Sequence, residues 1–479
     1  MPRHLGGQRP RCPGVGSLLV LAGVAAVVLA GCTSGREAAT SPRRSSPPVT
    51  TFQLPPVVHP VSFARQGRQR FDTPPSTAAC QATSGVACYS PKQLQQAYDL
   101  GPLFRAGDDG KGETVVIVDC FGSPTISSDL ATFDKAFQLP PPPSLSIVTP
   151  AGALPAWDAT GSGPMLVWGE ETSLDVEYAH AMAPGARMVL VETPVAETEG
   201  TAGFPQIETA EIWAIEHENP AVISQSFGAT EGTFPSARSI LRLRSAYELA
   251  AKDHVTVLAA TGDDGSTDSS SVTGSELFTS RAVDWPSTDP LVTAVGGLQL
   301  HLNESGARVL PDNVWNDTNL FGTPSAGSGG VSKVFARPAF QAGVTDIVGA
   351  HRGVPDVSLS AAEDGGALVY ESFPGLEKGF YIIGGTSEAT PLLAGIVAVA
   401  DEVAGKHLGW LNPYLYRLQA AGAAGIVDVT IGSNTVTFFQ GGETVTVPGY
   451  EAAPGYDLAS GLGTVDATRL ARELRTIAG

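Results

Sequence analysis

Short runs of apolar and β-branched residues alternate along this chain with longer stretches in which apolar residues recur at a helical period. The runs expected to form strands are 114–118, 187–191, 221–224, 255–259 and 291–295. The helical stretches between and around them are 128–137, 172–182 and 238–252. Continuous apolar strands separated by helices indicate a parallel sheet that is covered on both faces. We see no internal repeat, so the region from about Cys80 onward is predicted to form one α/β domain of about 400 residues.

The N-terminal segment has a different pattern, a single apolar run over 15–30 that follows three arginines. Such a run is typical of a secretory signal and is too short for a comfortable membrane span. It ends in Leu-Ala-Gly-Cys at Cys32, which resembles the bacterial lipobox, where the cysteine becomes the lipidated first residue. The alternative is an ordinary cleaved signal with a chance cysteine. Because several acyl chains anchor a protein stably, we predict a signal peptide over 1–31 and a lipid anchor at Cys32.

The next segment, 32–79, is rich in serine, proline and threonine. Residues 33–79 carry six arginines against only Glu37 and Asp72. This composition favours an extended tether over a packed domain, and a basic tether suits the surface of an anionic membrane. We therefore expect a globular domain over 80–479, held at the outer face of the cell membrane. Release to the extracellular space is the alternative.

Composition and cysteines narrow the possible partners and the compartment. The net charge of −19 argues against nucleic acid, whose phosphates would be repelled. A strongly acidic surface stays soluble as carboxylates begin to protonate, which allows work at low pH. Cys80 and Cys88 could close a small disulfide loop in an oxidising compartment. Cys120 follows an apolar run and is interpreted as a buried small hydrophobic residue.

The segment Gly384-Gly385-Thr386-Ser387 introduces a long apolar stretch of small residues, which predicts a buried helix. Pro391 is tolerable only near the start of that helix, where backbone N–H groups lack partners. Ser387 would then lie at a helix N-terminus, whose dipole favours developing negative charge. The alternative is a serine or threonine that only caps a core helix.

A nucleophilic serine needs a base. None of the eight histidines lies in a His-Gly-Thr-His setting, and His180, within a helical stretch, is better explained as a structural residue. Glu171 and Asp175 are four residues apart, so they share one helix face. Carboxylates held this close share a proton, which separates their apparent pKa values. On a solvated helix the same pair would only repel mildly.

A third candidate, Asp263, follows the predicted strand 255–259 in Gly-Asp-Asp-Gly. In subtilisin-like enzymes the corresponding turn supplies an asparagine amide to the oxyanion hole. An aspartate can donate a hydrogen bond there only when it is protonated, which would tie activity to acid pH. The alternative is an ordinary turn aspartate before glycine.

Together these segments resemble the sedolisin family of serine-carboxyl peptidases over roughly 90–470. The family's Glu-x-x-x-Asp motif implies that Glu171 is the general base and Asp175 its partner. Its Gly-Asp-x-Gly motif implies that Asp263 is the oxyanion acid, and its Gly-Thr-Ser-x-x-x-Pro motif that Ser387 is the nucleophile. The resemblance also implies a subtilisin-like α/β fold, with a mostly parallel central sheet flanked by helices on both faces.

The resemblance extends to a calcium site near the C-terminus. Calcium prefers hard oxygen ligands from carboxylates and backbone carbonyls. The ligands implied for one structural ion are the side chains of Asp428 and Asp457 and the carbonyls of Val429, Ala453 and Gly455. An unoccupied glycine-rich turn is the alternative.

Two features depart from the family pattern. Asp119 stands where subtilisins keep their catalytic aspartate, but without the histidine it can at most support the other carboxyls. Sedolisins usually carry a large N-terminal pro-domain, and 33–79 is too short and too rich in proline to be one.

The sequence therefore predicts a monomeric serine endopeptidase that cleaves peptide or protein substrates at acid pH. Two other functions stay open. A non-catalytic lipoprotein could use the same fold as a binding surface or scaffold. An esterase could use Ser387, although no Gly-x-Ser-x-Gly elbow surrounds it.

Overall fold

The computed structural model describes residues 69–160, 163–271 and 276–479. Contacts divide the chain after Thr51, and every described residue belongs to the second unit, Phe52–Gly479. The predicted signal peptide, Cys32 and most of the predicted tether lie outside the described residues. The fold begins before Cys80, because Phe71 forms a β-bridge with Phe380 and helix α1 (Thr77–Ser84) begins at the capping residue Ser76.

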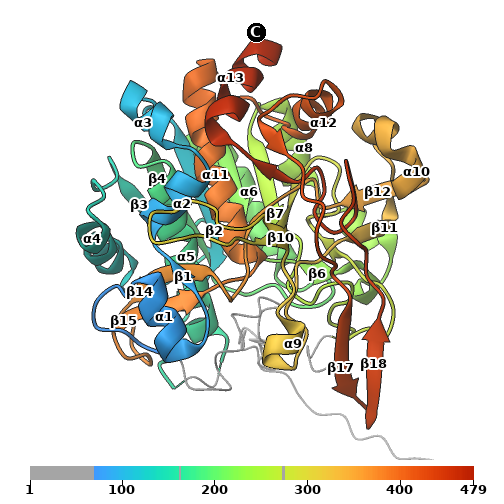
Figure 1. The fold of residues 1–479 in the computed structure, drawn as a ribbon, viewed down its shortest axis with the longest axis horizontal. Helices are drawn as coiled ribbons and strands as arrows, with labels where there is room; N and C mark the ends of the chain where they lie inside the picture. Colours follow the sequence, from blue (N-terminus) through green and yellow to red (C-terminus); the bar gives the residue numbers. More distant parts are fainter. Residues whose placement is uncertain (1–68, 161–162, 272–275) are drawn as a thin grey trace, which may run out of the picture. The chain divides into compact units, whose positions relative to one another are not determined.

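A mostly parallel sheet lies at the centre of this unit (Figure 1). In the described part of the chain it has eight strands, in the order β10-β9-β7-β5-β2-β4-β3, with β13 also paired to β9. Their bounds are β10 Asn313–Val314, β9 Thr293–Gln299, β7 Thr256–Ala260, β5 Val222–Gln225, β2 Thr114–Cys120, β4 Arg187–Thr193, β3 Leu145–Val148 and β13 Val357–Ser360. All five strands expected from the sequence belong to this sheet and pair in parallel. Only β10 runs antiparallel to its neighbour.

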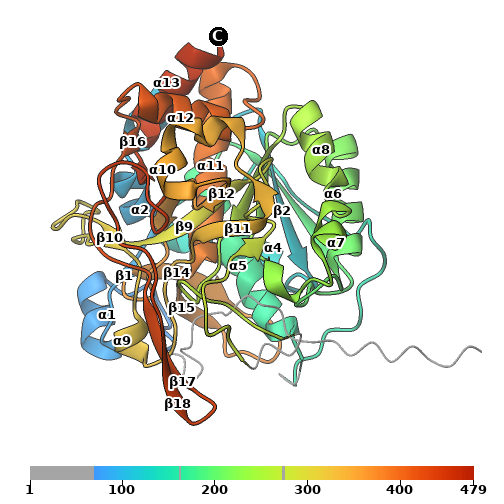
Figure 2. The same cartoon turned by 90° about the vertical axis from the view of Figure 1, so that its right-hand side faces the viewer.

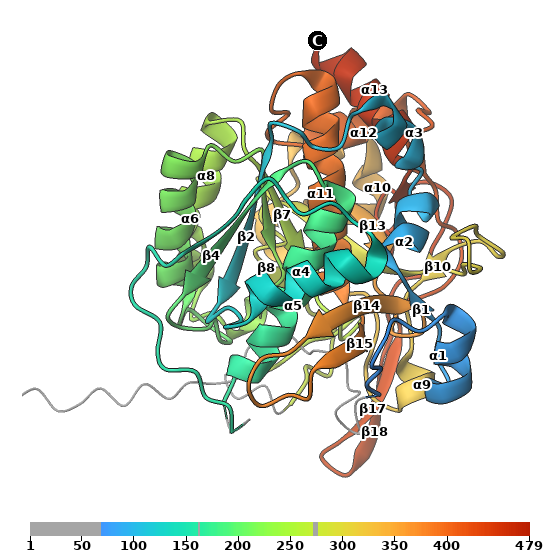
Figure 3. The ribbon, with the colours of Figure 1, turned by 90° about the vertical axis from the view of Figure 1, so that its left-hand side faces the viewer.

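Helices cover both faces of the sheet (Figures 2 and 3). Helices α5 (Met165–Met182) and α11 (Thr386–Ala404) pack on one face, and α6 (Phe204–Glu218) and α8 (Ser245–Lys252) on the other. Strand β2 contributes side chains to the core on both faces of the sheet, because alternate side chains point to opposite faces. Val115 packs on the side of α5 and Val116 on the side of α6. The predicted subtilisin-like α/β architecture is confirmed.

Helices α5 and α11 approach each other closely because α11 carries a glycine at the contact. A Cβ atom on Gly395 would lie 2.4 Å from the Cβ of Met182 and 2.8 Å from the carbonyl oxygen of Ala179. Any larger residue would therefore push the two helices apart. This contact matters for function, since the candidate base and the candidate nucleophile lie on these two helices.

Two helix predictions need correction. The stretch 172–182 is only the end of α5, which begins seven residues earlier at Met165. The stretch 238–252 is two helices, α7 (Ala237–Leu241) and α8, separated by a turn. The turn brings the Arg244 guanidinium to the buried carboxylate of Asp289, with Nη2 to Oδ1 at 2.9 Å. A long-range ion pair thus overrides the local helical pattern.

The remaining elements surround this core. The smaller strands are β1 Cys88–Tyr89, β6 Ala229–Thr230, β8 Asp284–Trp285, β11 Gly330–Ala336, β12 His351–Val354, β14 Gly366–Glu371, β15 Gly379–Ile383, β16 Ile426–Val427, β17 Val436–Gln440, β18 Glu443–Val447 and β19 Thr464–Val465. The other helices are α2 Pro91–Ala97, α3 Gly101–Ala106, α4 Ile126–Phe137, α9 Thr318–Phe321, α10 Thr345–Val348, α12 Asn412–Ala420 and α13 Ala467–Ala478, with 3₁₀ turns at Glu231–Thr233 and Ala339–Val344.

Cys80 and Cys88 form a disulfide with an S–S distance of 2.00 Å, a pairing that the sequence left open. Cys120 is free and buried, as expected from the sequence. His180 is fully buried, and its Nε2 lies 2.9 Å from the carbonyl oxygen of Pro140, so its structural role is confirmed. Within the described residues, every helix is too short or too polar to cross a membrane.

Candidate active site

Three neighbouring parallel strands bring polar residues to one edge of the sheet. Asp119 lies near the end of β2, Ser226 directly follows β5, and Asp263 follows β7. Because the carboxyl ends of parallel strands meet at the same edge, this is where α/β sheets bind ligands. Ser226 and Asp263 line a small cavity together with Ser387.

Ser387 is the second residue of α11, in its first turn. The preceding N-cap, Gly385, has φ 109°, and a Cβ atom there would lie 2.7 Å from Oδ2 of Asp263. Only glycine therefore allows the chain to turn into the helix beside Asp263. In this turn Ser387 lies near the unpaired N–H groups of the helix N-terminus. It is only 4% exposed, so few water molecules reach it.

Pro391 lies inside α11, one turn after Ser387. Proline lacks the N–H that would bond to the carbonyl oxygen four residues earlier, which is the oxygen of Ser387. That oxygen instead lies 3.4 Å from Oγ of Ser226. The proline thus frees a carbonyl that ties the start of α11 to the end of β5.

Glu171 and Asp175 project from one face of α5, one turn apart, and both are buried. Oγ of Ser226 donates to Oδ1 of Asp175 at 2.9 Å. Burial raises the pKa of both carboxyls well above their usual range, and the charge of Asp119 adds to the rise. The Ser387 hydroxyl and, more weakly, that of Ser226 act against the rise in the pKa of Glu171.

Asp119 belongs to the same cluster of carboxyls. It is fully buried in β2, and burial raises its pKa to about 7. Burial together with the charge of Asp119 raises the pKa of Glu192 to about 8. Within the described part of the chain, no ion pair with lysine, arginine or histidine neutralises Asp119, Glu171 or Asp175. Protons must therefore limit the charge of this cluster.

Asp263 is fixed beside the candidate nucleophile through Thr386. The backbone N–H and the hydroxyl of Thr386 both donate to Oδ1 of Asp263, at 2.7 and 2.8 Å. Because Oδ1 accepts two hydrogen bonds, we expect the proton of the acid form to reside on Oδ2. An acid hydrogen at that position is the donor that an oxyanion needs.

The loop that follows Asp263 is held from behind by the base of the β17–β18 hairpin. The backbone N–H of Ser266 donates to the carbonyl oxygen of Asn434 at 3.0 Å, and its hydroxyl donates to that of Val447 at 2.8 Å. The hairpin base thereby supports the position of Asp263.

Two residues of the site were missed by the sequence analysis. Ser226 could have been found, since it is a polar residue directly after a predicted parallel strand. Asp284 comes from the short strand β8, which has no apolar run to reveal it, and it lines the same cavity. Burial, and then the charge of Asp268, raise the pKa of Asp284 well above its usual range.

The proposed calcium ligands come together around one turn. Oδ2 of Asp428 accepts from the backbone N–H of Gly455, and Oδ2 of Asp457 from that of Ala453, both at 2.9 Å. The hydroxyl of Ser460 lies 3.4 Å from the carbonyl oxygen of Val429. Two carboxylates and nearby carbonyls are a hard-oxygen set that suits calcium. No group of three or more acidic, histidine or cysteine side chains that could hold a metal was found among the described residues.

Comparisons with known proteins agree with this architecture. The model of the subtilase family matches residues 167–420. Kumamolisin of Bacillus sp. (strain MN-32) is 33% identical over 88% of this chain and 68% of its own length, and sedolisin of Pseudomonas sp. (strain 101) is 27% identical over 84% and 64%. The solved structure of Pseudomonas sedolisin, complexed with two molecules of pseudo-iodotyrostatin, superposes with a TM-score of 0.65 at 25% identity, covering 82% of this chain and 99% of that one. The chain thus spans about two thirds of the length of these two peptidases.

Proposed function

The chain belongs to the sedolisin family of subtilisin-like serine peptidases, and on this premise we propose that it is an endopeptidase acting at acid pH through Ser387, Glu171, Asp175 and Asp263. The observation that supports the proposal is a pair of links to the start of α11. Ser226 lies within hydrogen-bond distance of both Asp175 and the carbonyl oxygen of Ser387, and Asp263 is bonded to Thr386, the neighbour of Ser387.

In the first half of the reaction, Oγ of Ser387 attacks the peptide carbonyl carbon while Glu171 accepts the hydroxyl proton. The proposed mechanism requires Asp119 and Asp175 to keep protons, so that Glu171 carries the negative charge of the cluster and can act as base. The carbonyl oxygen becomes an oxyanion, and the acid hydrogen of Asp263 donates to it. The N-terminus of α11 adds a favourable dipole.

In the second half, Glu171 returns its proton to the leaving amine as the C–N bond breaks. Water then attacks the acyl-enzyme, losing a proton to Glu171, and the second oxyanion forms in the same position beside Asp263. As this intermediate collapses, the bond to Oγ of Ser387 breaks and Glu171 returns its proton to Oγ, which releases the carboxylic acid and restores the Ser387 hydroxyl. Each side chain ends in the state in which it began.

A non-catalytic scaffold on the same fold is the alternative. The carboxyl cluster argues against it, because burying ionisable groups without cations lowers stability. A binding surface elsewhere on the fold gains nothing from that cost, whereas an acid–base mechanism needs such groups.

The deciding experiment compares the wild type with Ser387→Ala on unfolded protein and on simple esters at acid pH. We expect the wild type to cleave the protein and the variant to lose nearly all activity, by about 10⁶-fold as in other serine peptidases. Ser358→Ala is the matched control, since Ser358 is a buried serine on β13 whose hydroxyl bonds only to the carbonyl oxygen of Ser460. Cleavage of esters alone would favour the esterase, and a wild type without hydrolytic activity would favour the scaffold.

We also propose one structural calcium ion, held by Asp428 and Asp457 with the carbonyls of Val429, Ala453 and Gly455. Bound calcium would supply a positive charge that joins the two carboxylates across the turn. Because a ligand that binds only the folded state stabilises it, chelation should lower the melting temperature, and Asp428→Asn should abolish that response. An unchanged melting temperature after verified calcium removal would count against the site.

Finally, we propose that the protein acts as a monomer at the outer face of the cell membrane, through lipid on Cys32. The residues that support this lie outside the described structure, so the test is biochemical. Wild-type protein should partition with membranes, and Cys32→Ala should appear in the soluble fraction. Equal membrane binding by the two would contradict the anchor.

A further inference from the structure

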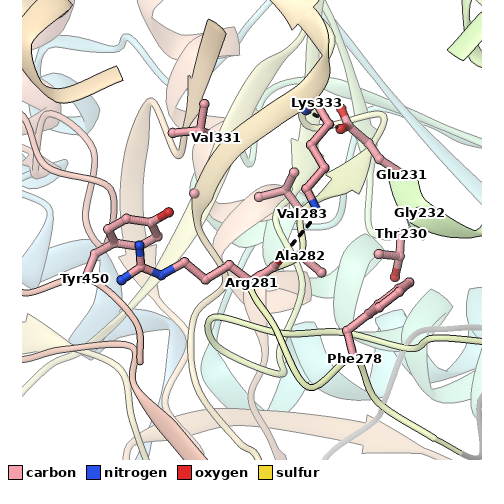
Figure 4. A pocket seen from close by; sticks show the side chains of 11 residues that line it. Thr230, Glu231, Gly232, Phe278, Arg281, Ala282, Val283, Val331, Lys333 and Tyr450 are labelled. Carbon is pink, nitrogen blue, oxygen red and sulfur yellow. Dashed lines mark hydrogen bonds between the residues drawn. The ribbon is translucent and has the colours of Figure 1, made fainter. Parts of the chain in front are cut away.

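A second cavity, of about 190 Å³, lies next to the active site (Figure 4). Four segments distant in sequence build its wall: the end of β6 with the following 3₁₀ turn, the chain leading into β8, the start of β11, and the chain after β18. The lining residues are Thr230, Glu231, Gly232, Phe278, Arg281, Ala282, Val283, Gly330, Val331, Lys333 and Tyr450. We call this cavity the Lys333 pocket.

The Lys333 pocket and the cavity of Ser387 share one extended segment, the chain that runs into β8. Val283 lines the pocket, and the next residue, Asp284, lines the cavity that contains Ser387. Across the β6–β8 pair, Thr230 also lines the pocket and is the register partner of Asp284. A polypeptide bound at Ser387 would therefore pass within a few residues of the pocket.

Two cations flank the pocket. The Arg281 guanidinium stacks over the ring of Tyr450 at 4.2 Å and donates to the carbonyl oxygens of Pro448 and Gly449. Nζ of Lys333 reaches only a backbone oxygen, that of Arg281, at 3.4 Å. Neither side chain forms an ion pair among the described residues.

The nearest acid of the pocket does not neutralise Lys333. The carboxylate of Glu231 accepts from the hydroxyl of Ser332 at 2.6 Å and from the backbone N–H of Lys333 at 2.8 Å. Figure 4 shows it at the backbone of Lys333, with the Lys333 side chain extending away from it. In a chain of net charge −19, two cations that meet only carbonyls and an aromatic ring favour an incoming anion.

The walls between the two cations are apolar, formed by side chains such as Val283, Val331 and Phe278. The volume is below that of typical sites for whole small molecules, and it suits one amino-acid side chain. An occupant should therefore have a short apolar stem and a negative end. Glutamate has this structure, and aspartate is its shorter form.

We propose that the Lys333 pocket is a substrate subsite that binds an acidic side chain of the polypeptide, a few residues from the cleaved bond. This proposal rests on the proposed peptidase function. The substrate carboxylate would lie between Lys333 and Arg281, and its methylene groups against Val283 and Val331. The subsite makes the enzyme select acidic stretches of its substrates.

The test measures binding without turnover, in Ser387→Ala protein at pH 5, where most glutamate side chains are ionised. Fluorescent peptides of one length carry a single glutamate at successive positions, with glutamine and leucine counterparts. We expect one position at which glutamate binds more tightly than glutamine or leucine. Adding Lys333→Met should reduce that advantage about threefold to tenfold, because the lysine is exposed. Lys333→Glu should reverse it in favour of lysine peptides.

Lys111→Met is the matched control, an exposed lysine whose recorded contact is through its backbone N–H; it should leave the preference unchanged. If no position favours glutamate, or if Lys333→Met keeps the full advantage, the subsite is refuted. A preference for leucine that survives Lys333→Met would show an apolar subsite and would also refute it. If the peptides bind as expected but wild-type protein cleaves none of them, the peptidase proposal fails and the acidic subsite stands.

Discussion

Two pairs of residues, each four apart in sequence, are almost fully buried in this protein, and they hold their charge in opposite ways. Arg352 and Asp356 are 0% exposed and form a bidentate ion pair, with Nη1 to Oδ1 at 2.7 Å. The carboxylate also accepts from the hydroxyl of Tyr416 and the backbone N–H of Ala294.

Glu171 and Asp175 are as deeply buried, but their neighbours are the hydroxyls of Ser387 and Ser226 and a third carboxyl, Asp119. In the first pair a counter-ion neutralises the buried carboxylate, and in the second pair bound protons do so. A counter-ion gives a fixed structure at any pH, whereas protons can be exchanged with a substrate. Exchangeable protons therefore suit the acid–base role that we propose for Glu171 and Asp175.

We expect the largest change in activity when Glu171 is replaced. Glu171→Gln removes the proposed base, so kcat/KM should fall by about 10⁴-fold. Because it also removes a buried acid from the crowded cluster, the variant should unfold at the same or a higher temperature than the wild type at neutral pH. Assays at acid pH and thermal melts measure the two effects. Glu177→Gln, a buried glutamate on the same helix, is the control and should keep activity. Full activity of Glu171→Gln would refute its role.

Removing the cation of the Arg352–Asp356 pair leaves Asp356 without a counter-ion. Arg352→Met leaves Asp356 buried without its counter-ion, which should lower the free energy of unfolding by about 3–5 kcal/mol at neutral pH. The loss should shrink in acid medium, where Asp356 can be protonated. Denaturant unfolding at several pH values measures this. A loss that is the same at every pH would show that packing, and not charge, dominates the pair.

Asp263→Asn tests whether the acidic optimum depends on one proton. The amide keeps a donor but changes the oxyanion position, so kcat at the acid optimum should fall by about 10²–10³-fold. The wild-type profile should be bell-shaped, and the variant should lose or weaken the alkaline limb. A wild type that is fastest at neutral pH would contradict the assignment, as would a fully active variant with an unchanged alkaline limb.

The pH dependence of stability is a prediction that needs no substitution. Burial raises the pKa of Asp119 to about 7 and that of Glu192, Glu199 and Glu388 to about 8. A raised pKa means that the folded state holds the proton more tightly than the unfolded state. Its stabilisation is complete below the ordinary value near 4 and is lost as pH rises through 7 to 8. The melting temperature should therefore fall between pH 5 and pH 9, which calorimetry can measure. A higher melting temperature at pH 9 would contradict this.

The sequence predicted those features that depend on local pattern. Apolar runs identified the parallel strands, and Gly385 before Ser387 identified the start of the buried helix. Features that depend on distant partners were not predictable in this way. The break before Ser245 needs Asp289, and the contribution of Ser226 needs both Asp175 and Pro391. Asp284 was missed because two-residue strands such as β8 have no period to detect.

The β17–β18 hairpin has a consequence for redesign of this enzyme. Its base supports the loop of Asp263, but its tip, Gly441-Gly442, has positive φ at both residues and is exposed. Insertions are tolerated best at exposed turns of small residues. Foreign loops, tags or binding peptides should therefore be accepted at the tip, while changes near Asn434 or Val447 would be felt in catalysis. The tip of the hairpin is thus suited to grafting, whereas its base supports the loop of the proposed oxyanion acid.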